Sequence, residues 1–311
     1  MSALICGSYA FDTIMVFDGR FRDQILPDQV HMLNVAFLVP ALRREFGGTA
    51  GNMAYNLKML GGDGMAMSTV GADFDSYWEW LDRNAIRQDF IKQIDEEYTA
   101  QAYITTDKDD NQITAFHPGA MNLSHTQEVP RDAGISMGVV APDGRDGMIQ
   151  HAQQFADAGI PFLFDPGQGL PMFDGEELKR FVDQATWVAV NSYESEMMQE
   201  RTGLSEAQIA ERVNAMIVTH GGKGSTIRTN GESVEVEPVK PEAVNDPTGC
   251  GDAYRAGLIY GIMNDMDWAT TGRIASLMGS IKVAHNGTQN HSFSPDEFEA
   301  RFRDAFGYSF D

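Results

Sequence analysis

One stretch of the chain combines an acid, small residues and a turn in a pattern that could do chemistry. Residues 245–257 read Asn-Asp-Pro-Thr-Gly-Cys-Gly-Asp-Ala-Tyr-Arg-Ala-Gly. Gly249 and Gly251 allow the backbone to bend tightly, and from Asp252 onward apolar residues recur at helical spacing. We therefore expect a loop that ends at a helix N-terminus, where amide N–H groups without helical partners stabilise a bound phosphate.

Two interpretations of Asp252 follow from this position. An Asp at the start of a helix often only caps it, because the side chain accepts hydrogen bonds from the first amides. A cap needs no glycine on either side of a small residue, whereas a loop that lets a polyphosphate approach its backbone does. The functional interpretation is a carboxylate base next to an anion hole. Cys250 is either a reactive thiol at the helix start or a small packing residue.

Length, composition and charge narrow the class of protein. The chain has 311 residues, 42% of them hydrophobic, which suffices for one large α/β domain or two small ones. The longest apolar run, residues 35–42, contains Pro40 and is far shorter than the roughly 20 residues of a membrane-spanning helix. A formal charge of −22 disfavours nucleic acid and anionic membrane as partners, so any phosphate site must be local.

The cysteines and the first residues of the chain indicate the cellular compartment of the protein. Residues 1–5 show no basic stretch and no cleavage site, so no secretion signal is expected. Cys6 and Cys250 lie far apart without metal-ligand spacing, which fits a reducing compartment. The sequence therefore predicts a cytoplasmic protein without a disulfide framework.

Alternating strands and helices indicate a parallel sheet. Short apolar strands are predicted near residues 3–7, 135–140, 161–164, 187–190 and 215–219. Helical patterns such as residues 147–158 separate them. This alternation is typical of a doubly wound α/β sheet, in which ligands bind at the carboxyl ends of the strands.

A second, smaller sheet is predicted from segments without helical connections. Residues 13–17 and 32–38 are rich in β-branched, aromatic and large apolar side chains. Residues 101–105 and 112–116 form a predicted hairpin. We assign all four to one extra sheet.

Two stretches of the chain resemble the signatures of the ribokinase-like, or PfkB, family of carbohydrate and nucleoside kinases. The family's C-terminal signature is Asp-Thr-x-Gly-Ala-Gly-Asp-Ala-Phe, and residues 246–254 read Asp-Pro-Thr-Gly-Cys-Gly-Asp-Ala-Tyr. The N-terminal signature, Gly-Gly-x-x-x-Asn-x-Ala, matches residues 47–54. The resemblance covers essentially the whole chain. It implies one ribokinase-like domain over residues 1–311, an α/β fold with a doubly wound, mostly parallel sheet and a small β-sheet lid at about 13–45 and 98–120.

The resemblance also implies the catalytic groups. In the family the last Asp of the C-terminal signature is the catalytic base and the Gly-x-Gly amides form the anion hole, which here gives Asp252 with Gly249, Cys250 and Gly251. Cys250 and Tyr254 depart from the pattern, but neither departure removes a catalytic group. The chain contains no Gly-x-x-x-x-Gly-Lys-Ser/Thr motif, so phosphate handling falls to this loop.

Sugar-binding residues are implied near the N-terminus. Asp12 follows Gly7 at the spacing of a family Asp that accepts two sugar hydroxyls, although a lone Asp after a strand is also a common turn residue. Gly48 and Asn52 would bind sugar hydroxyls as well, the glycine by close backbone approach and the amide because it both donates and accepts.

A nucleotide site is implied in the second half of the chain. Its predicted residues are Asn191, Thr219, Gly221, Gly224 and Thr248. Glu194 matches the Glu of the family's Asn-x-x-Glu, which helps to hold Mg²⁺ through water, although a helix cap followed by a surface Glu is the plain alternative. Residues 287–291 lie near where relatives bind a monovalent cation and adenine. The implied cofactors are ATP and Mg²⁺, and K⁺ stays open.

The acceptor is inferred from aromatic residues. Residues 115–121 and 287–291 resemble bacterial adenosine kinases within the family, in which aromatic side chains sandwich adenine. This points to Tyr103 and Phe116, which could equally be core aromatics of the small sheet. The favoured function is transfer of the γ-phosphate of ATP to the 5′-hydroxyl of adenosine, giving AMP.

Two rivals remain open. One is a sugar kinase of the same family that acts on ribose or another sugar, and the other is a non-catalytic nucleotide- or sugar-binding regulator. A dinucleotide dehydrogenase is excluded because residues 6–11 lack Gly-x-Gly-x-x-Gly. The expected partners are ATP and adenosine or a sugar, with no nucleic acid and no membrane, and a homodimer stays open.

Overall fold

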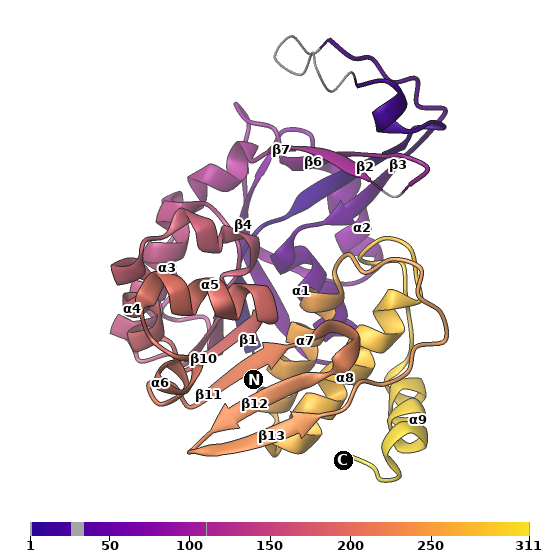
Figure 1. Cartoon of the computed structure of the whole chain (residues 1–311). Helices are drawn as coiled ribbons and strands as arrows, with labels where there is room; N and C mark the ends of the chain where they lie inside the picture. Colours follow the sequence, from indigo (N-terminus) through magenta and orange to yellow (C-terminus); the bar gives the residue numbers. More distant parts are fainter. Residues whose placement is uncertain (1, 26–33, 110, 311) are drawn as a thin grey trace.

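A computed structural model describes residues 2–25, 34–109 and 111–310, and within them the chain forms two sheets (Figure 1). The larger has nine strands in the order β13-β12-β11-β10-β9-β8-β1-β4-β5. Its strands are β1 Ser2–Cys6, β4 Gly64–Gly71, β5 Arg87–Ile94, β8 Ile135–Val140, β9 Phe162–Phe164, β10 Trp187–Asn191, β11 Ala215–Thr219, β12 Ser225–Thr229 and β13 Glu232–Val236. All pairings from β5 to β11 are parallel, and β12 and β13 add an antiparallel edge.

Helices cover both faces of this sheet, which is why its central strands are almost continuously apolar. Their bounds are α1 Thr49–Met59, α2 Asp75–Arg83, α3 Arg145–Ala158, α4 Gly175–Gln184, α5 Ser192–Thr202, α6 Glu206–Ala210, α7 Cys250–Met263, α8 Trp268–Val283 and α9 Pro295–Phe306. On β1, Ala3 and Ile5 pack in one core with α1, α2, α7 and α8, whereas Leu4 and Cys6 pack in the other with α3 to α6. The predicted doubly wound arrangement is therefore present.

The smaller sheet, here called the lid, lies above the main sheet in Figure 1. Its order is β3-β2-β6-β7, with β2 Ala10–Val16, β3 Ala41–Gly47, β6 Ala100–Thr106 and β7 Gln112–His117. β2 follows β1 after three residues, so the lid is anchored directly to an interior strand of the main sheet. The predicted hairpin is confirmed, because β6 and β7 pair antiparallel.

One lid strand differs from the prediction. Residues 34–39 form no regular element, residues 32 and 33 lie outside the described residues, and the strand runs over Ala41–Gly47 instead. β3 is an edge strand whose first four residues are exposed, so apolar patterning does not mark it. Residues 26–33 of the predicted lid segment 13–45 also lie outside the described residues, and the lid boundaries stay a prediction. Within the described residues, no helix is both long and apolar enough to span a membrane.

Candidate active site

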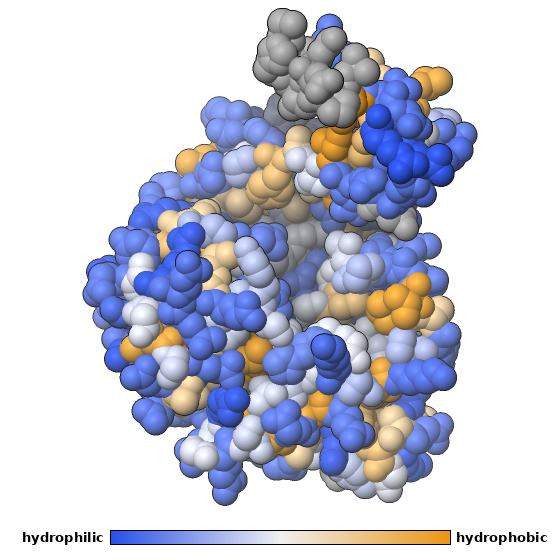
Figure 2. All heavy atoms as spheres, viewed as in Figure 1, coloured by the Kyte–Doolittle hydropathy of each residue, from blue (hydrophilic) through white to orange (hydrophobic). Residues whose placement is uncertain are grey.

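A cavity of about 550 Å³ lies beneath the lid, and Figure 2 shows the surface hollowed between the lid and the main body. Its wall brings together segments from the whole chain. The predicted residues that line it are Asp12, Gly48, Asn52, Phe116, Thr248, Gly249 and Asp252. Cys250 and Gly251 follow directly as the first residues of α7.

Asp252 does not cap α7. The helix begins at Cys250 after Gly249, whose φ of 77° is left-handed, and no side chain caps its first amides. The Asp252 carboxylate instead accepts a hydrogen bond from Asn52 Nδ2 at 2.7 Å. Burial raises the pKa of Asp252 to about 7, the Asn52 hydrogen bond opposes that rise, and the nearby Asp165 carboxylate adds to it. A carboxyl group that titrates near neutrality in a cavity is suited to accept a proton.

Asn52 is oriented by a chain of hydrogen bonds that the sequence did not reveal. Gln289 Nε2 donates to Asn52 Oδ1 at 2.9 Å, and Trp80 Nε1 donates to Gln289 Oε1 at 2.8 Å. Because the Asn52 carbonyl is engaged in this way, its amide N–H₂ is turned towards Asp252. The sequence indicates a cation and adenine near residues 287–291 but does not indicate this role of Gln289.

Only glycine fits the backbone at position 48. Its φ is +88°, and a Cβ there would lie 2.5 Å from both Ala10 N and Ser8 O. Asp12 lies on the same wall, where burial, followed by the charges of Asp246 and Glu45, raises its pKa to about 6. The structure thus places Asp12, Gly48 and Asn52 around one space, and their role in hydroxyl recognition stays a prediction.

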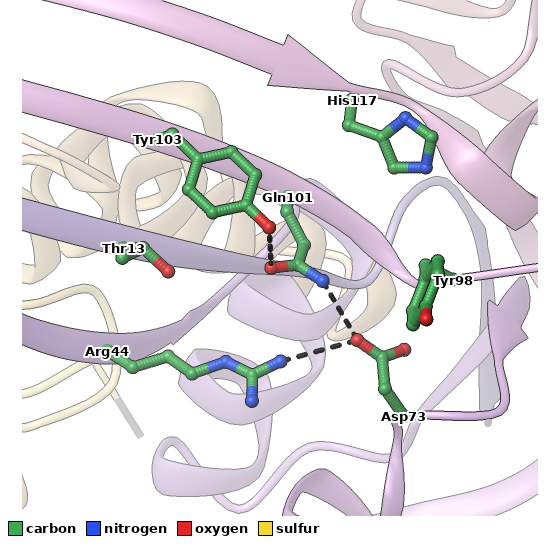
Figure 3. A pocket seen from close by; sticks show the side chains of 7 residues that line it. All are labelled: Thr13, Arg44, Asp73, Tyr98, Gln101, Tyr103 and His117. Carbon is green, nitrogen blue, oxygen red and sulfur yellow. Dashed lines mark hydrogen bonds and ion pairs between the residues drawn. The ribbon is translucent and has the colours of Figure 1, made fainter.

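The lid separates the two predicted aromatic residues. Ala102 pairs with Phe116, and both line the cavity, whereas the next residue, Tyr103, pairs with Ala115 and belongs to a separate pocket of about 320 Å³. Figure 3 shows the Tyr103 hydroxyl directed at Gln101, to which it donates at 2.8 Å. Successive side chains of a strand point to opposite faces, so Tyr103 cannot share a ligand with Phe116 across this cavity. The predicted sandwich of one base between the two is not formed.

A buried ion pair lies one helical turn after Asp252. Arg255 is 4% exposed, and its Nε and Nη2 donate to Asp165 at 3.1 and 3.2 Å. Its Nη2 also lies 3.9 Å from Glu194 Oε2. The Arg255 charge opposes the rise in the Asp252 pKa. A signal for this pair was available, because an arginine within an apolar helix needs a buried partner.

Two of the predicted nucleotide residues, Asn191 and Thr219, are register partners at the carboxyl ends of β10 and β11. Asn191 Oδ1 accepts from Glu194 N, and Glu194 Oε2 accepts from Asn191 N, both at 2.8 Å. Asn191 and Glu194 therefore cap α5, which is the structural alternative to a role in Mg²⁺ binding. Within the described residues, no group of three or more His, Cys, Asp or Glu side chains could hold a metal ion on its own. Mg²⁺ coordination at Glu194 stays a prediction.

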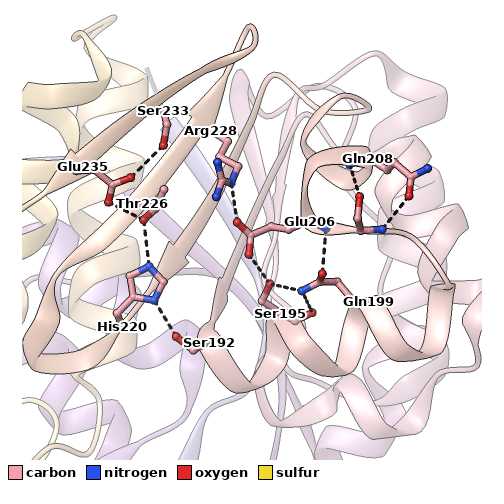
Figure 4. Close-up of polar contacts among 11 residues, drawn as sticks. Ser192, Ser195, Gln199, Glu206, Gln208, His220, Thr226, Arg228, Ser233 and Glu235 are labelled. Carbon is pink, nitrogen blue, oxygen red and sulfur yellow. Dashed lines mark hydrogen bonds and ion pairs between the residues drawn. The ribbon is translucent and has the colours of Figure 1, made fainter.

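The turn after β11 is fixed by its backbone and by one histidine. Gly221 and Gly224 have φ of 58° and 93°, and a Cβ on Gly224 would lie 2.1 Å from Val236 O. His220 contacts Ser192 Oγ at 2.8 Å and Thr226 Oγ1 at 3.1 Å, as Figure 4 shows. These residues do not line the cavity that holds Asp252.

A doubly wound sheet with a lid over a carboxylate and a glycine loop at a helix N-terminus defines a phosphotransferase that acts on a hydroxyl group. Residues 12–296 match the pfkB family carbohydrate kinases, and the chain belongs to that family. The resemblance found in the sequence is thereby confirmed.

Several of the proteins that this chain resembles are nucleoside kinases. A nucleoside kinase of Methanocaldococcus jannaschii is 33% identical over 261 residues, which cover 83% of this chain and 85% of that protein. The structure of Burkholderia thailandensis nucleoside kinase in complex with inosine is 51% identical, with a TM-score of 0.90 over 99% of each chain. The same enzyme in complex with ADP-inosine is 52% identical, with a TM-score of 0.89 over 99% of this chain and 97% of that one. These likenesses confirm the ribokinase-like α/β fold with its lid.

Proposed function

We propose that the protein is a nucleoside kinase that transfers the γ-phosphate of ATP to the 5′-hydroxyl of a purine nucleoside, adenosine among them. The observation that carries the proposal is Asp252, a cavity carboxylate with a pKa of about 7 beside the Gly249 loop at the start of α7. The nucleoside kinases of M. jannaschii and B. thailandensis support a nucleoside over a free sugar. ATP as donor is supported by the complex of the B. thailandensis enzyme with ADP-inosine, since ADP is what remains of ATP after transfer.

In this mechanism Asp12 and Asn52 hold the ribose hydroxyls. Asp252 accepts the proton of the 5′-hydroxyl as that oxygen attacks the γ-phosphorus in line, and ADP leaves. The amides of Gly249, Cys250 and Gly251 stabilise the charge on the transferred phosphoryl oxygens. Mg²⁺ bound with ATP would neutralise phosphate charge, and Glu194 is the carboxylate at that end of the site that would hold it through water.

The apolar end of the cavity favours an acceptor that carries a base. Phe116, Met121 and Met172 line it together with Ala102, and Phe116 is 51% exposed. A nucleobase has a flat apolar face for these side chains, whereas a free pentose is covered by hydroxyls. This wall supports a nucleoside kinase over the rival sugar kinase.

A coupled assay of ADP release over a panel of nucleosides and sugars tests the function. We expect turnover with adenosine and inosine and little with free ribose. Ribose as the best acceptor would establish the sugar kinase, and no ADP release with any acceptor would leave a binding protein. The cytoplasmic location stays a prediction, and the homodimer stays open.

A further inference from the structure

The loop that leads into the anion hole is tied to the end of α8 through Asp246. Asp246 Oδ1 accepts from Thr248 N and its Oδ2 from Gly287 N, both at 2.9 Å. The amide of Asn245 also donates to Val283 O at 2.9 Å. The position of residues 248–251, which would face the transferred phosphate, therefore depends on what holds Asp246 in place.

A lysine ammonium lies at this junction. The Lys282 side chain on α8 is fully buried, and its Nζ donates to Asp246 O at 2.7 Å and to His285 O at 3.2 Å. Burial lowers the pKa of Lys282, whereas Asp246 and Asp252 favour its charged form. A buried ammonium persists only where such partners compensate its desolvation. The two carbonyls come from the loop before the anion hole and from the turn after α8, so one cation joins both segments.

This arrangement is the kind of site that a monovalent cation would otherwise fill. Backbone carbonyls replace the hydration shell of K⁺ in proteins, and here two of them, Asp246 O and His285 O, converge on Lys282 Nζ. Arg43 of the lid adds a second positive charge, with Nη2 3.8 Å from Asp246 Oδ2. The residues near 287–291 therefore do not fit an added K⁺, because a side chain already supplies the charge.

We propose that Lys282 is a built-in cation that positions the anion-hole loop, so that phosphoryl transfer does not depend on an added monovalent cation. Lys282 is a positioning residue, since it acts on the phosphate through Asp246 and the loop that follows. The ammonium and the carbonyls that it joins belong to the protein itself, so they can hold the loop amides in place without an added ion. The proposal rests on the proposed kinase function for its activity readout.

The first test uses the unchanged protein. Nucleoside phosphorylation is measured in KCl, NaCl and choline chloride at one ionic strength, with Mg²⁺ and ATP fixed. We expect the three rates to agree within about twofold, since the charge is supplied internally. A rate in KCl about tenfold or more above that in choline chloride would overturn the proposal.

The second test removes the ammonium. Lys282→Ala should lose about tenfold or more in kcat in choline chloride and regain much of it with K⁺ or NH₄⁺, because the truncated side chain leaves room for a cation between the carbonyls. Lys58→Ala, at an exposed position on α1, is the matched control and should respond to no cation. A folded Lys282→Ala protein that keeps the wild-type kcat in choline chloride, or that no cation reactivates, would overturn the proposal.

Thermal unfolding separates this proposal from the kinase function. The melting temperature of Lys282→Ser should rise in KCl relative to choline chloride, whereas that of the wild type should not, because only the variant has room for a bound ion. This readout needs no turnover, so it holds even if no nucleoside is phosphorylated. Equal melting temperatures of Lys282→Ser in the two salts would count against a cation site. Should neither variant fold, the salt comparison of the wild type still decides.

Discussion

At the acceptor end of the site, Asp252 and Asn52 lie 200 positions apart in sequence and are joined by a hydrogen bond of 2.7 Å. At the nucleotide end, Asn191 and Glu194 are three positions apart and each accepts from the other's backbone amide. The acceptor end is thus assembled by the tertiary fold, whereas the nucleotide end is built largely from local turns and helix starts. We expect changes at the first to alter acceptor chemistry, and changes at the second to act on ATP and on backbone stability together.

The largest effect is expected at the carboxylate of the acceptor end. Asp252→Asn should lower kcat by at least about 10²-fold while ATP affinity changes only a few-fold, because the amide keeps the shape of the side chain but cannot accept a proton. Steady-state kinetics and calorimetry with an ATP analogue measure the two quantities. Near-wild-type turnover in a variant that binds ATP normally would remove Asp252 as the base.

The same contrast explains what the sequence could predict. Glycine turns and helix starts are local, so the loop at Gly249 could be expected from the residues themselves, and Gly48 and Gly224 could be matched to short family motifs by resemblance. Gln289, Arg255 and Lys282 were missed because their partners lie far away along the chain, and a single sequence shows only their residue types. Each is a polar residue in a buried position, and its contacts exist only after the sheet and helices have packed.

Tyr103 shows a second limit of sequence reasoning. The hairpin was predicted correctly, but the face on which each side chain lies depends on the register of the strand. A difference of one residue moves an aromatic ring from the cavity to another pocket. Ala102 lines the cavity, and Tyr103 does not. The edge strand β3 was misplaced for a related reason, because its exposed residues carry no apolar pattern.

Substitutions at the sugar-binding wall should weaken the acceptor alone. Asp12→Ala and Asn52→Ala should each reduce acceptor affinity by roughly 1.5–3 kcal/mol, since hydroxyls would be buried without a charged or bifunctional partner. ATP affinity should barely change, because neither residue lies at the carboxyl ends of β10 and β11. Calorimetric titrations with each ligand provide the measurement. Equal losses for both ligands would contradict the division of the site into two ends.

The lid offers a matched pair of aromatic substitutions. Phe116→Ala should weaken adenosine binding by about 5- to 150-fold, because stacking of an aromatic on a base contributes about 1–3 kcal/mol. Tyr103→Ala, on the other face, should change it much less. The ratio of adenosine to ribose phosphorylation is the readout that separates base recognition from lid packing. If both substitutions lower this ratio equally, or if Phe116→Ala lowers both activities by one factor, Phe116 does not bind the base.

Substitutions at the nucleotide end should affect both the stability of the protein and the KM for ATP. Asn191→Ala removes the cap of α5 and should destabilise the protein by about 1 kcal/mol while raising the KM for ATP a few-fold. Ser205→Ala is the control, because Ser205 and Gln208 form the same kind of capping box at α6. It should cost similar stability without affecting ATP. A KM for ATP that is unchanged in Asn191→Ala would reduce Asn191 to a structural cap.

The smallest effect is a displacement of the pH profile, and it tests whether the Asn52 contact tunes the base. Burial raises the pKa of Asp252 to about 7, and only the ionised form accepts a proton, so kcat/KM should rise with pH and level off above neutrality. On the acid limb of the profile, well below that pKa, kcat/KM should fall about tenfold per pH unit. Removing the donor in Asn52→Ala should move this limb to higher pH, because the hydrogen bond stabilises the carboxylate. Asp12→Asn should move it to lower pH, because the Asp12 charge raises the pKa of Asp252. Opposite shifts in the two variants would tie the limb to Asp252, whereas a limb that stays at one pH in both would assign it to another group.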